Sequence, residues 1–337
     1  MALVAGAKPT EIAVIGLGAW GSALAQYCAQ LGHHVTAWHR DDGHLAAIRS
    51  AQEISIAKDC RVPLPTTMRV TSNLADCRAQ PISIIALPAS AWPDVLPTLK
   101  PQGLVVSASK GLERTAQITP LTWCHRVLGV SSERLCVISG PSFARDLAQR
   151  TPITLVAASG SEDTAALVAK ILSSSSVRVY VSNDPLGVEL GGILKNVIAI
   201  AVGISDALGY GPSTRAALIT RGLSEMTRVA VALGAQHQTL SGLSGLGDLV
   251  MTATDDQSRN RIVGLRLGRG EKLSEILSSL GSTAEGVLSA PIVETIAREK
   301  AVDAPIISLV VKVLRGEIAP KDLAATLMTR PLKGEFS

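Results

Sequence analysis

The chain of 337 residues, 47% of them hydrophobic and 18% charged, has the composition of a folded protein with room for two domains. Its formal net charge of +4 can help attract anionic substrates but is too small to indicate nucleic acid, and aromatic residues at 3% leave few platforms on which bases could stack. We therefore expect no nucleic-acid partner.

Cysteine usage and the apolar segments bear on the compartment. The five cysteines are odd in number and include no CxxC pair, so they fit neither a disulfide framework nor a zinc site. Residues 1–9 lack the basic start and long apolar core of a secretory signal. The apolar run around Val197 is interrupted by Lys195 and Asn196 and falls short of a membrane span. We expect no metal, no membrane insertion and a cytoplasmic location.

The first predicted elements are a strand at 11–15, a helix at 22–31 and a second strand at 34–38. The sequence GLGAWG stands between the first strand and the helix, at 16–21. A strand, a GxGxxG motif, a helix and a strand within about thirty residues are the context that a dinucleotide-binding site requires.

Each glycine of this motif has a specific purpose in such a site. Gly16 permits the tight turn, Gly18 lets the backbone approach a pyrophosphate, and Gly21 lets the helix pack on the strand. The N-terminus of the helix then faces the negative charge of the pyrophosphate.

The end of the second strand bears on cofactor choice. An NAD-specific protein usually carries an acid there for the ribose hydroxyls, but this chain has His39 and Arg40, and Asp41 comes slightly late. An arginine can accommodate a 2′-phosphate, so the sequence favours NADP(H) while NAD(H) stays open. The alternative is that Arg40 is an exposed loop residue.

Strands and helices continue to alternate up to about residue 182, which predicts a largely parallel, doubly wound sheet. Ligands bind beyond the carboxyl ends of the strands of such a sheet. The further predicted strands are at 68–71, 82–87, 104–108, 135–139, 153–157 and 177–181, and predicted helices include 91–99 and 119–128.

Two strand ends carry suggestive residues. Lys110 follows one strand and places a cation at the rim of the crevice, with a surface lysine as the alternative. Ser142 follows another strand, and we expect it to cap a helix at 144–148, so that the helix N-terminus points into the crevice. A purely structural cap is the alternative.

From Pro185 onwards strand patterns vanish and the chain reads as consecutive helices. The predicted fold class is therefore α/β, a doubly wound Rossmann-type domain followed by an all-α helical substrate domain. We place the boundary so that residues 1–184 form the dinucleotide-binding domain and 185–337 the helical substrate and catalytic domain.

The run 190–204 reads as a helix buried on all sides, in which only Lys195 and Asn196 are polar. A desolvated lysine beside a cleft can have its pKa lowered towards neutrality, which suits proton transfer. Gly191 and Gly192 share its helical face and leave room for another backbone or a ligand. The alternative is a lysine that pairs with a buried carboxylate or points outward.

A glycine-rich turn ending at Asp248 precedes a second polar cluster. Ser258 is a good N-cap candidate, which places Arg259 and Asn260 in the first turn of the following helix. The helix dipole disfavours a cation there, and a bound phosphate would give a reason for it. The alternative is that Asp255 or Asp256 neutralises the arginine.

Seven blocks, in this order, resemble the bacterial NAD(P)-dependent sn-glycerol-3-phosphate dehydrogenase family, from about Glu11 to Arg315. They are GLGAWGSALA (16–25), SKGLE (109–113), ISGPSFARDL (138–147), GVELGGILKNVIAIAVGISD (187–206), ALITRGLSEM (217–226), SGLGDL (244–249) and TDDQSRNR (254–261).

The resemblance implies interconversion of sn-glycerol 3-phosphate and dihydroxyacetone phosphate by hydride transfer, in a homodimer that supplies glycerophospholipid synthesis. It implies Lys195 as the general acid/base, with Asn196 and Asp248 orienting it. It implies substrate binding by Lys110, Gly140, Ser142, Lys195, Asp248, Ser258, Arg259 and Asn260. It implies that NADP(H) or NAD(H) is bound, besides the motif glycines, by Ala19, Trp20, His39, Arg40, Lys110, Ala144, Arg259 and Glu285.

Three rival hypotheses also have to be considered for this sequence. A β-hydroxyacid dehydrogenase or ketopantoate-type reductase also joins a Rossmann domain to a helical one, but typically has an asparagine four residues after the catalytic lysine, where this chain has Ala199. A nucleotide-sensing module without turnover would need no phosphate cluster at 258–260. A structural interaction protein would not explain a lysine inside an apolar helix.

Overall fold

The computed structural model describes residues 8–281, 283–329, 331 and 334, so the N-terminal segment examined for a signal falls mostly outside the described residues. The chain divides into two compact units. The first consists of residues 1–109 and 113–185, and the second of residues 110–112 and 186–337. The short segment 110–112 therefore belongs to the helical unit, although the chain on both sides of it belongs to the first unit.

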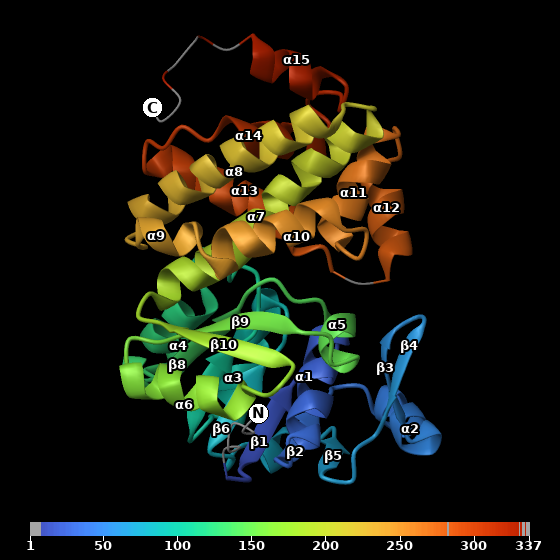
Figure 1. Ribbon diagram of the computed structural model, residues 1–337, viewed down its shortest axis with the longest axis vertical. Helices are drawn as coiled ribbons and strands as arrows, with labels where there is room; N and C mark the ends of the chain where they lie inside the picture. The colour runs from blue at the N-terminus through green and yellow to red at the C-terminus, as the bar shows by residue number, and fades with distance from the viewer. Residues whose placement is uncertain (1–7, 282, 330, 332–333, 335–337) are drawn as a thin grey trace. The chain divides into compact units, whose positions relative to one another are not determined.

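An eight-stranded sheet forms the centre of the first unit, in the order β10-β9-β8-β7-β6-β1-β2-β5 (Figure 1). Neighbouring strands are parallel except β8 and β9, which are antiparallel. The strands are β1 (Glu11–Ile15), β2 (His34–Trp38), β5 (Met68–Thr71), β6 (Ile82–Ile85), β7 (Leu104–Ser107), β8 (Leu135–Ser139), β9 (Ile153–Ala158) and β10 (Val177–Ser182). Alternation with helices confirms the predicted Rossmann-type α/β class.

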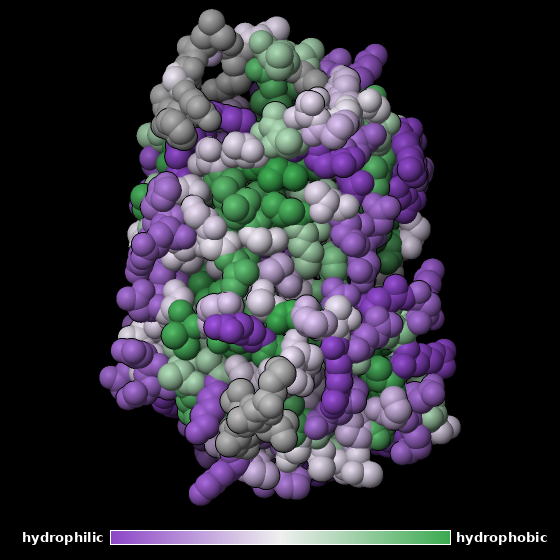
Figure 2. Space-filling view, viewed as in Figure 1, coloured by the Kyte–Doolittle hydropathy of each residue, from purple (hydrophilic) through white to green (hydrophobic). Residues whose placement is uncertain are grey.

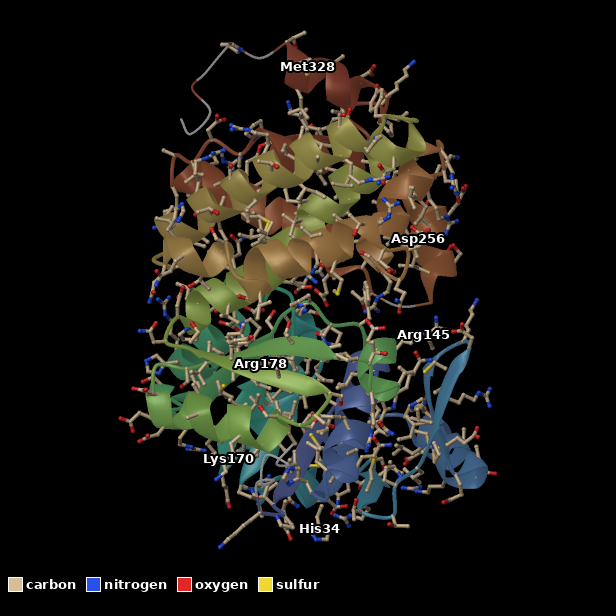
Figure 3. All side chains as sticks on the ribbon, in the orientation of Figure 1. His34, Arg145, Lys170, Arg178, Asp256 and Met328 are labelled. Atoms are coloured by element: carbon tan, nitrogen blue, oxygen red, sulfur yellow. The ribbon has the colours of Figure 1, made fainter. Side chains whose placement is uncertain are left out.

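The helices of the first unit are α1 (Ala19–Gln30), α2 (Asp42–Ala51), α3 (Trp92–Leu99), α4 (Pro120–Leu128), α5 (Ala144–Ala148) and α6 (Glu162–Leu172), with short 3-10 turns η1 (Leu74–Cys77), η2 (Ala89–Ala91) and η3 (Ser132–Arg134). A separate antiparallel hairpin, β3 (Glu53–Ala57) and β4 (Cys60–Pro63), was not predicted. An ion pair between Asp59 at its tip and Arg145 of α5 joins it to the rest of the unit (Figure 3).

Every element in the described part of the second unit is helical. The helices are α7 (Pro185–Ala207), α8 (Pro212–Ala232), α9 (His237–Leu240), the π-helical turn η4 (Leu243–Gly247), α10 (Asp248–Thr254), α11 (Arg259–Gly268), α12 (Leu273–Leu280), α13 (Glu285–Glu299), α14 (Pro305–Leu314) and α15 (Asp322–Met328). Figure 1 shows α7 running through this unit among the other helices.

Helix α7 is the core of the second unit. The expectation that this apolar run is too short to span a membrane is wrong, because the helix has the length and composition to cross one. Its whole apolar window is nevertheless buried inside the protein, as expected for a core helix. Its glycines allow close neighbours: a Cβ on Gly191 would lie 2.5 Å from the carbonyl oxygen of Ser244. The prediction that this face admits another backbone is therefore confirmed for Gly191.

Helix α11 also packs directly on the backbone of α7. A Cβ on Gly203 of α7 would lie 2.4 Å from the carbonyl oxygen of Arg261, and one on Gly264 of α11 would lie 2.1 Å from that of Ile200. Real Cβ atoms do not approach other atoms so closely, so only glycine permits this helix separation.

The exposed surface of the second unit includes apolar side chains from α8, η4 and α10, namely Val231, Leu246 and Val250. Figure 2 shows hydrophobic residues in the middle of the visible face of this unit, with hydrophilic residues on both sides. Single exposed apolar residues are normal on a protein surface, but α10 is in contact with both α8 and η4, so these lie on neighbouring elements.

Candidate active site

The glycine-rich turn of the first unit has the geometry of a dinucleotide site. Gly16 has a φ of +104°, which favours glycine, and a Cβ on Gly21 would lie 1.9 Å from the carbonyl oxygen of Gly16. A Cβ on Gly18 would meet no atom within 4 Å, so this side of the turn is open. The turn therefore leaves room for a pyrophosphate at the N-terminus of α1.

The first turn of α1 fits an anionic cofactor in two further respects. It contains no acidic residue, and no side chain caps it. The indole nitrogen of Trp20 is buried and has no hydrogen-bond partner among the described residues. A buried donor without an acceptor is unusual, and a bound nucleotide could supply the acceptor. Ala19 is the first residue of the helix.

Asp41, the acidic residue that follows the end of β2, already has hydrogen-bond partners within the protein. Asp41 caps α2 and accepts hydrogen bonds from the backbone nitrogens of Gly43, at 2.8 Å, and His44, at 3.3 Å. The side chain of Arg40 is exposed, and the ring of His39 lies 4.5 Å from that of His44. Burial, and then the neighbouring His44, lower the pKa of His39.

The turn after β8 corrects one prediction. The N-cap of α5 is Phe143, not Ser142, and no side chain caps this helix. Ser142 instead donates a hydrogen bond to the carbonyl oxygen of Gly140, at 3.2 Å. Gly140 has a φ of +136°, and a Cβ there would lie 2.9 Å from the carbonyl oxygen of Thr154. Ser142 does not cap α5 because its hydroxyl bonds the preceding turn at Gly140 instead of the helix.

In the second unit Lys195 lies at the centre of a polar cluster. Its ammonium is buried, donates to Oδ1 of Asp248, and donates to Oγ1 of Thr252 at 2.7 Å. The second carboxylate oxygen, Oδ2, accepts from Nζ of Lys110 at 2.7 Å. One fully buried carboxylate thus holds two lysines, one on each oxygen.

Burial lowers the pKa of Lys195 to about 7. The charge of Asp248 raises it again, and the charge of Lys110 adds to the lowering. The lysine therefore pairs with a buried carboxylate, as the structural alternative expected, yet its pKa lies near neutrality, as proton transfer requires. Desolvation outweighs the ion pair because the amine has lost nearly all its water.

Sequence reasoning missed Thr252. Asp248 and Thr252 are the first and fifth residues of α10, and residues four apart share one face of a helix. The position of Thr252 four residues after Asp248 could have predicted its place in the site, because Asp248 had already been singled out at the end of the glycine-rich turn.

The first turn of α11 agrees with prediction. Ser258 is its N-cap and accepts a hydrogen bond from the backbone nitrogen of Arg261, at 3.2 Å. The two acids that could have neutralised Arg259 have other partners: Oδ1 of Asp255 accepts from the backbone nitrogen of Gln257 at 2.8 Å, and Asp256 pairs with Arg261. The side chain of Arg259 keeps an exposed surface, but the protein around its guanidinium displaces enough water to lower its pKa, while the charge of Glu285 acts in the opposite direction.

A chain of amides connects this turn with the lysine cluster. The side chain of Asn260 donates to Oδ1 of Asn196 at 2.9 Å and accepts from the backbone nitrogen of Gly286 at 2.9 Å. Asn196 in turn donates to the carbonyl oxygens of Gly192, at 3.2 Å, and Lys110, at 3.5 Å. The second unit therefore brings together Lys110, Lys195, Asn196, Asp248 and Asn260, while Gly16, Gly18, Ala19, Trp20, Gly21, His39, Arg40, Gly140, Ser142 and Ala144 belong to the first unit.

A Rossmann-type unit with an open glycine-rich turn, followed in the chain by a helical unit with a buried lysine of lowered pKa, defines the class of NAD(P)-dependent oxidoreductases. Known proteins identify the family. Residues 11–165 match the family described as NAD-dependent glycerol-3-phosphate dehydrogenase N-terminus, and residues 184–325 match its C-terminus. The chain belongs to the NAD-dependent glycerol-3-phosphate dehydrogenase family.

Individual relatives agree along almost the whole chain. A glycerol-3-phosphate dehydrogenase (NAD(P)+) of Geobacter sulfurreducens is 42% identical over 331 residues, covering 96% of this chain and 98% of that protein. One from Leptothrix cholodnii is 43% identical over 340 residues, covering 96% and 99%. The crystal structure of glycerol-3-phosphate dehydrogenase from Coxiella burnetii superposes with a TM-score of 0.89 at 33% identity, covering 96% of this chain and 99% of that one.

The protein is thus an enzyme with glycerol-3-phosphate dehydrogenase (NAD(P)+) activity. The hydroxyacid dehydrogenase, nucleotide-sensing and purely structural hypotheses are wrong.

Proposed function

We propose that the enzyme works mainly as a dihydroxyacetone phosphate reductase, with Lys195 as its general acid/base. The observation that carries this proposal is the buried ammonium of Lys195, fixed by Asp248 and Thr252, with a pKa of about 7. A group whose pKa lies near the working pH can both give and take a proton.

The chain contributes the proton and the electrostatics of the reaction, and the nicotinamide cofactor supplies the hydride when bound. As the carbonyl carbon is reduced, the ammonium of Lys195 stabilises the charge that develops on the oxygen and then donates a proton to it. Asp248 and Thr252 hold the ammonium so that its remaining proton points in one direction. In oxidation the neutral amine takes the proton of the C2 hydroxyl.

The phosphate end of the substrate is held by the first turn of α11. Ser258, Arg259 and Asn260 provide helix-terminal amides and a guanidinium with no acidic partner in that turn. The further residues proposed for substrate binding are Lys110, Gly140 and Ser142. Because the phosphate is remote from the reacting carbon, its binding energy can orient the substrate for hydride transfer.

We propose residues 1–184, apart from the segment 110–112 that belongs to the helical unit, as the dinucleotide-binding domain, and 185–337 as the substrate and catalytic domain. We assign cofactor binding to Gly16, Gly18, Ala19, Trp20, Gly21, His39, Arg40, Lys110, Ala144, Arg259 and Glu285. NADPH is the preferred cofactor, because Asp41 is committed to capping α2 while Arg40 is exposed at the end of β2.

We also propose a cytoplasmic homodimer that uses no metal and supplies glycerol 3-phosphate for glycerophospholipid synthesis. The family resemblance supports this, and the exposed apolar side chains on α8, η4 and α10 are consistent with an interface between copies. Analytical ultracentrifugation tests the dimer, and a sedimenting monomer at micromolar concentration would contradict it.

The central experiment measures NADPH and NADH oxidation with dihydroxyacetone phosphate, with unphosphorylated dihydroxyacetone as the control. We expect kcat/KM to be higher with NADPH, and the unphosphorylated control to be lower by about a hundredfold or more, since the phosphate contacts supply orientation. Equal rates with both ketones would contradict the phosphate assignment.

A further inference from the structure

Two of the sequence blocks end at charged residues to which the proposed mechanism gives no role. The block at 187–206 ends at Asp206, near the end of α7, and the block at 254–261 ends at Arg261, in the first turn of α11. The structure joins them: a guanidinium nitrogen of Arg261 donates to Oδ2 of Asp206. Their side chains are only 10% and 6% exposed.

Each of these residues also has a more exposed partner. The guanidinium of Arg215, at 38% exposure, bonds both oxygens of Asp206 at 3.0 and 3.1 Å. Asp256, at 79% exposure, accepts from Nε of Arg261 at 3.1 Å, and lies on the loop before α11 (Figure 3). The buried link in the middle is the one between Asp206 and Arg261.

Stability alone gives little reason for this link. A carboxylate near the C-terminus of α7 and a cation in the first turn of α11 both oppose the helix dipoles. Buried ion pairs seldom stabilise a fold more than apolar residues of the same volume, although breaking one partner is costly. What such a pair supplies is a fixed geometry between the two helices.

The pair lies next to the proposed phosphate-binding turn. The backbone nitrogen of Arg261 bonds Ser258, so Arg261 belongs to the same turn as Arg259 and Asn260. The glycine contacts between α7 and α11 let the helices touch but provide no directional bond. Two directional side-chain bonds join the helices: the Asn260–Asn196 bond beside Lys195, and the Asp206–Arg261 bond ten residues further along α7. The Asn260–Asn196 bond alone fixes one point of contact, and the Asp206–Arg261 bond adds the second point that an orientation needs.

We propose that Asp206 and Arg261 are positioning residues, which fix the phosphate-binding turn of α11 relative to Lys195 on α7. The proposal rests on the proposed function, namely that this turn binds the substrate phosphate. Neither side chain acts on the substrate directly.

The test compares Asp206→Asn with Asp256→Asn, since each substitution removes one of the two carboxylates that pair with Arg261. For Asp206→Asn we expect the KM for dihydroxyacetone phosphate and the Ki of inorganic phosphate to rise about tenfold, because loss of position weakens every phosphate contact. The KM for NADPH stays within about twofold. Asp256→Asn changes all three constants less than about twofold, because its carboxylate is solvated.

The outcomes separate position from stability. If Asp206→Asn lowers the melting temperature but leaves the phosphate Ki and substrate KM within twofold, the pair is only structural and the proposal is overturned. If Asp206→Asn does not fold, Arg261→Lys replaces it in the test, because lysine keeps the charge but loses the forked donor. The substrate KM and the phosphate Ki are measured again, and the same twofold limit applies. Arg259→Gln tests the proposed phosphate site. If its KM for dihydroxyacetone phosphate is unchanged, the phosphate site itself is refuted. If that KM rises while Asp206→Asn leaves the substrate KM and the phosphate Ki unchanged, only the positioning role is refuted.

Discussion

Lys195 is the residue on which the proposed chemistry depends, and its surroundings explain why a lysine can serve there. It is buried in an apolar helix, but its ammonium donates hydrogen bonds to two polar side chains, Asp248 and Thr252. Asp248 alone would hold the proton too tightly; burial and the charge of Lys110 bring the pKa back to about 7.

Replacing Lys195 with alanine removes the proton donor but no proposed nucleotide contact. We expect Lys195→Ala to lower kcat by about a thousandfold or more, while the Kd for NADPH changes less than about threefold. Stopped-flow and fluorescence titration measure the two quantities. Lys170→Ala, an exposed lysine of α6 labelled in Figure 3, is the control and should match the wild type. Near-normal turnover in Lys195→Ala would refute the role.

Thr252 should set the pH range of the reaction. Reduction needs the ammonium form of Lys195, so its rate should fall as pH rises through the pKa of about 7. Thr252→Val removes an acceptor that favours the ammonium, which lowers the pKa and moves this falling limb to lower pH by roughly one unit. Thr252→Ser keeps the hydroxyl and the wild-type profile. Identical profiles for valine and serine would contradict this reasoning.

At the scale of elements, an acid on α8 caps another helix. Glu225 is buried, and its carboxylate oxygens accept from the backbone nitrogens of Ile306 and Ile307, at 2.8 and 3.1 Å, in the first turn of α14. Burial nonetheless raises its pKa to about 7, while those two amides and the charge of Arg228 act in the opposite direction.

The consequence is a pH-dependent stability. Between about pH 4.5, the ordinary value, and about pH 7, the folded protein holds a proton on Glu225 that the unfolded chain has lost, so this residue makes stability fall as pH rises. Glu225→Gln does not titrate. We expect its free energy of unfolding, relative to wild type, to improve by a few kcal/mol from pH 4.5 to pH 7.5. Urea titrations at both pH values measure this, and the exposed Glu299→Gln should show no such trend.

The elements also show what sequence patterns could and could not predict. All eight strands of the main sheet were found because their apolar runs are bounded by turns and helices. The β3–β4 hairpin was missed although buried and exposed residues alternate along it, because strands of five and four residues give too short a pattern to recognise. The antiparallel pairing of β8 and β9 and the turned-back hydroxyl of Ser142 depend on tertiary packing, which no local pattern contains.

At the scale of the whole molecule, cofactor binding should be visible as stability. A ligand present at a hundred times its Kd stabilises a folded protein by about 2.7 kcal/mol, and tenfold weaker binding removes about 1.4 kcal/mol of that. We expect Arg40→Ala to reduce the rise in melting temperature caused by NADPH but not the rise caused by NADH. Arg126→Ala, an exposed arginine of α4, is the matched control. An equal loss with both cofactors would show that Arg40 does not read the 2′-phosphate.

The lysine cluster was predictable in part at this scale. Lys110, Lys195 and Asp248 stand far apart in the sequence, and each was singled out from its own local context. Their meeting on one carboxylate was not predictable from spacing, because it depends on how segment 110–112 packs with the helical unit.

The packing of segment 110–112 with the helical unit limits how the protein can be divided into fragments. A recombinant fragment starting at residue 186 would contain Lys195, Asp248 and Thr252, yet one oxygen of the buried carboxylate would lose its donor, because Lys110 is encoded upstream. Hybrids that exchange the helical half between relatives face the same difficulty. In such a hybrid, residues 110–112 have to come from the same relative as the helical unit. Otherwise the segment that carries the lysine bonded to Asp248 and the helices around it come from different proteins.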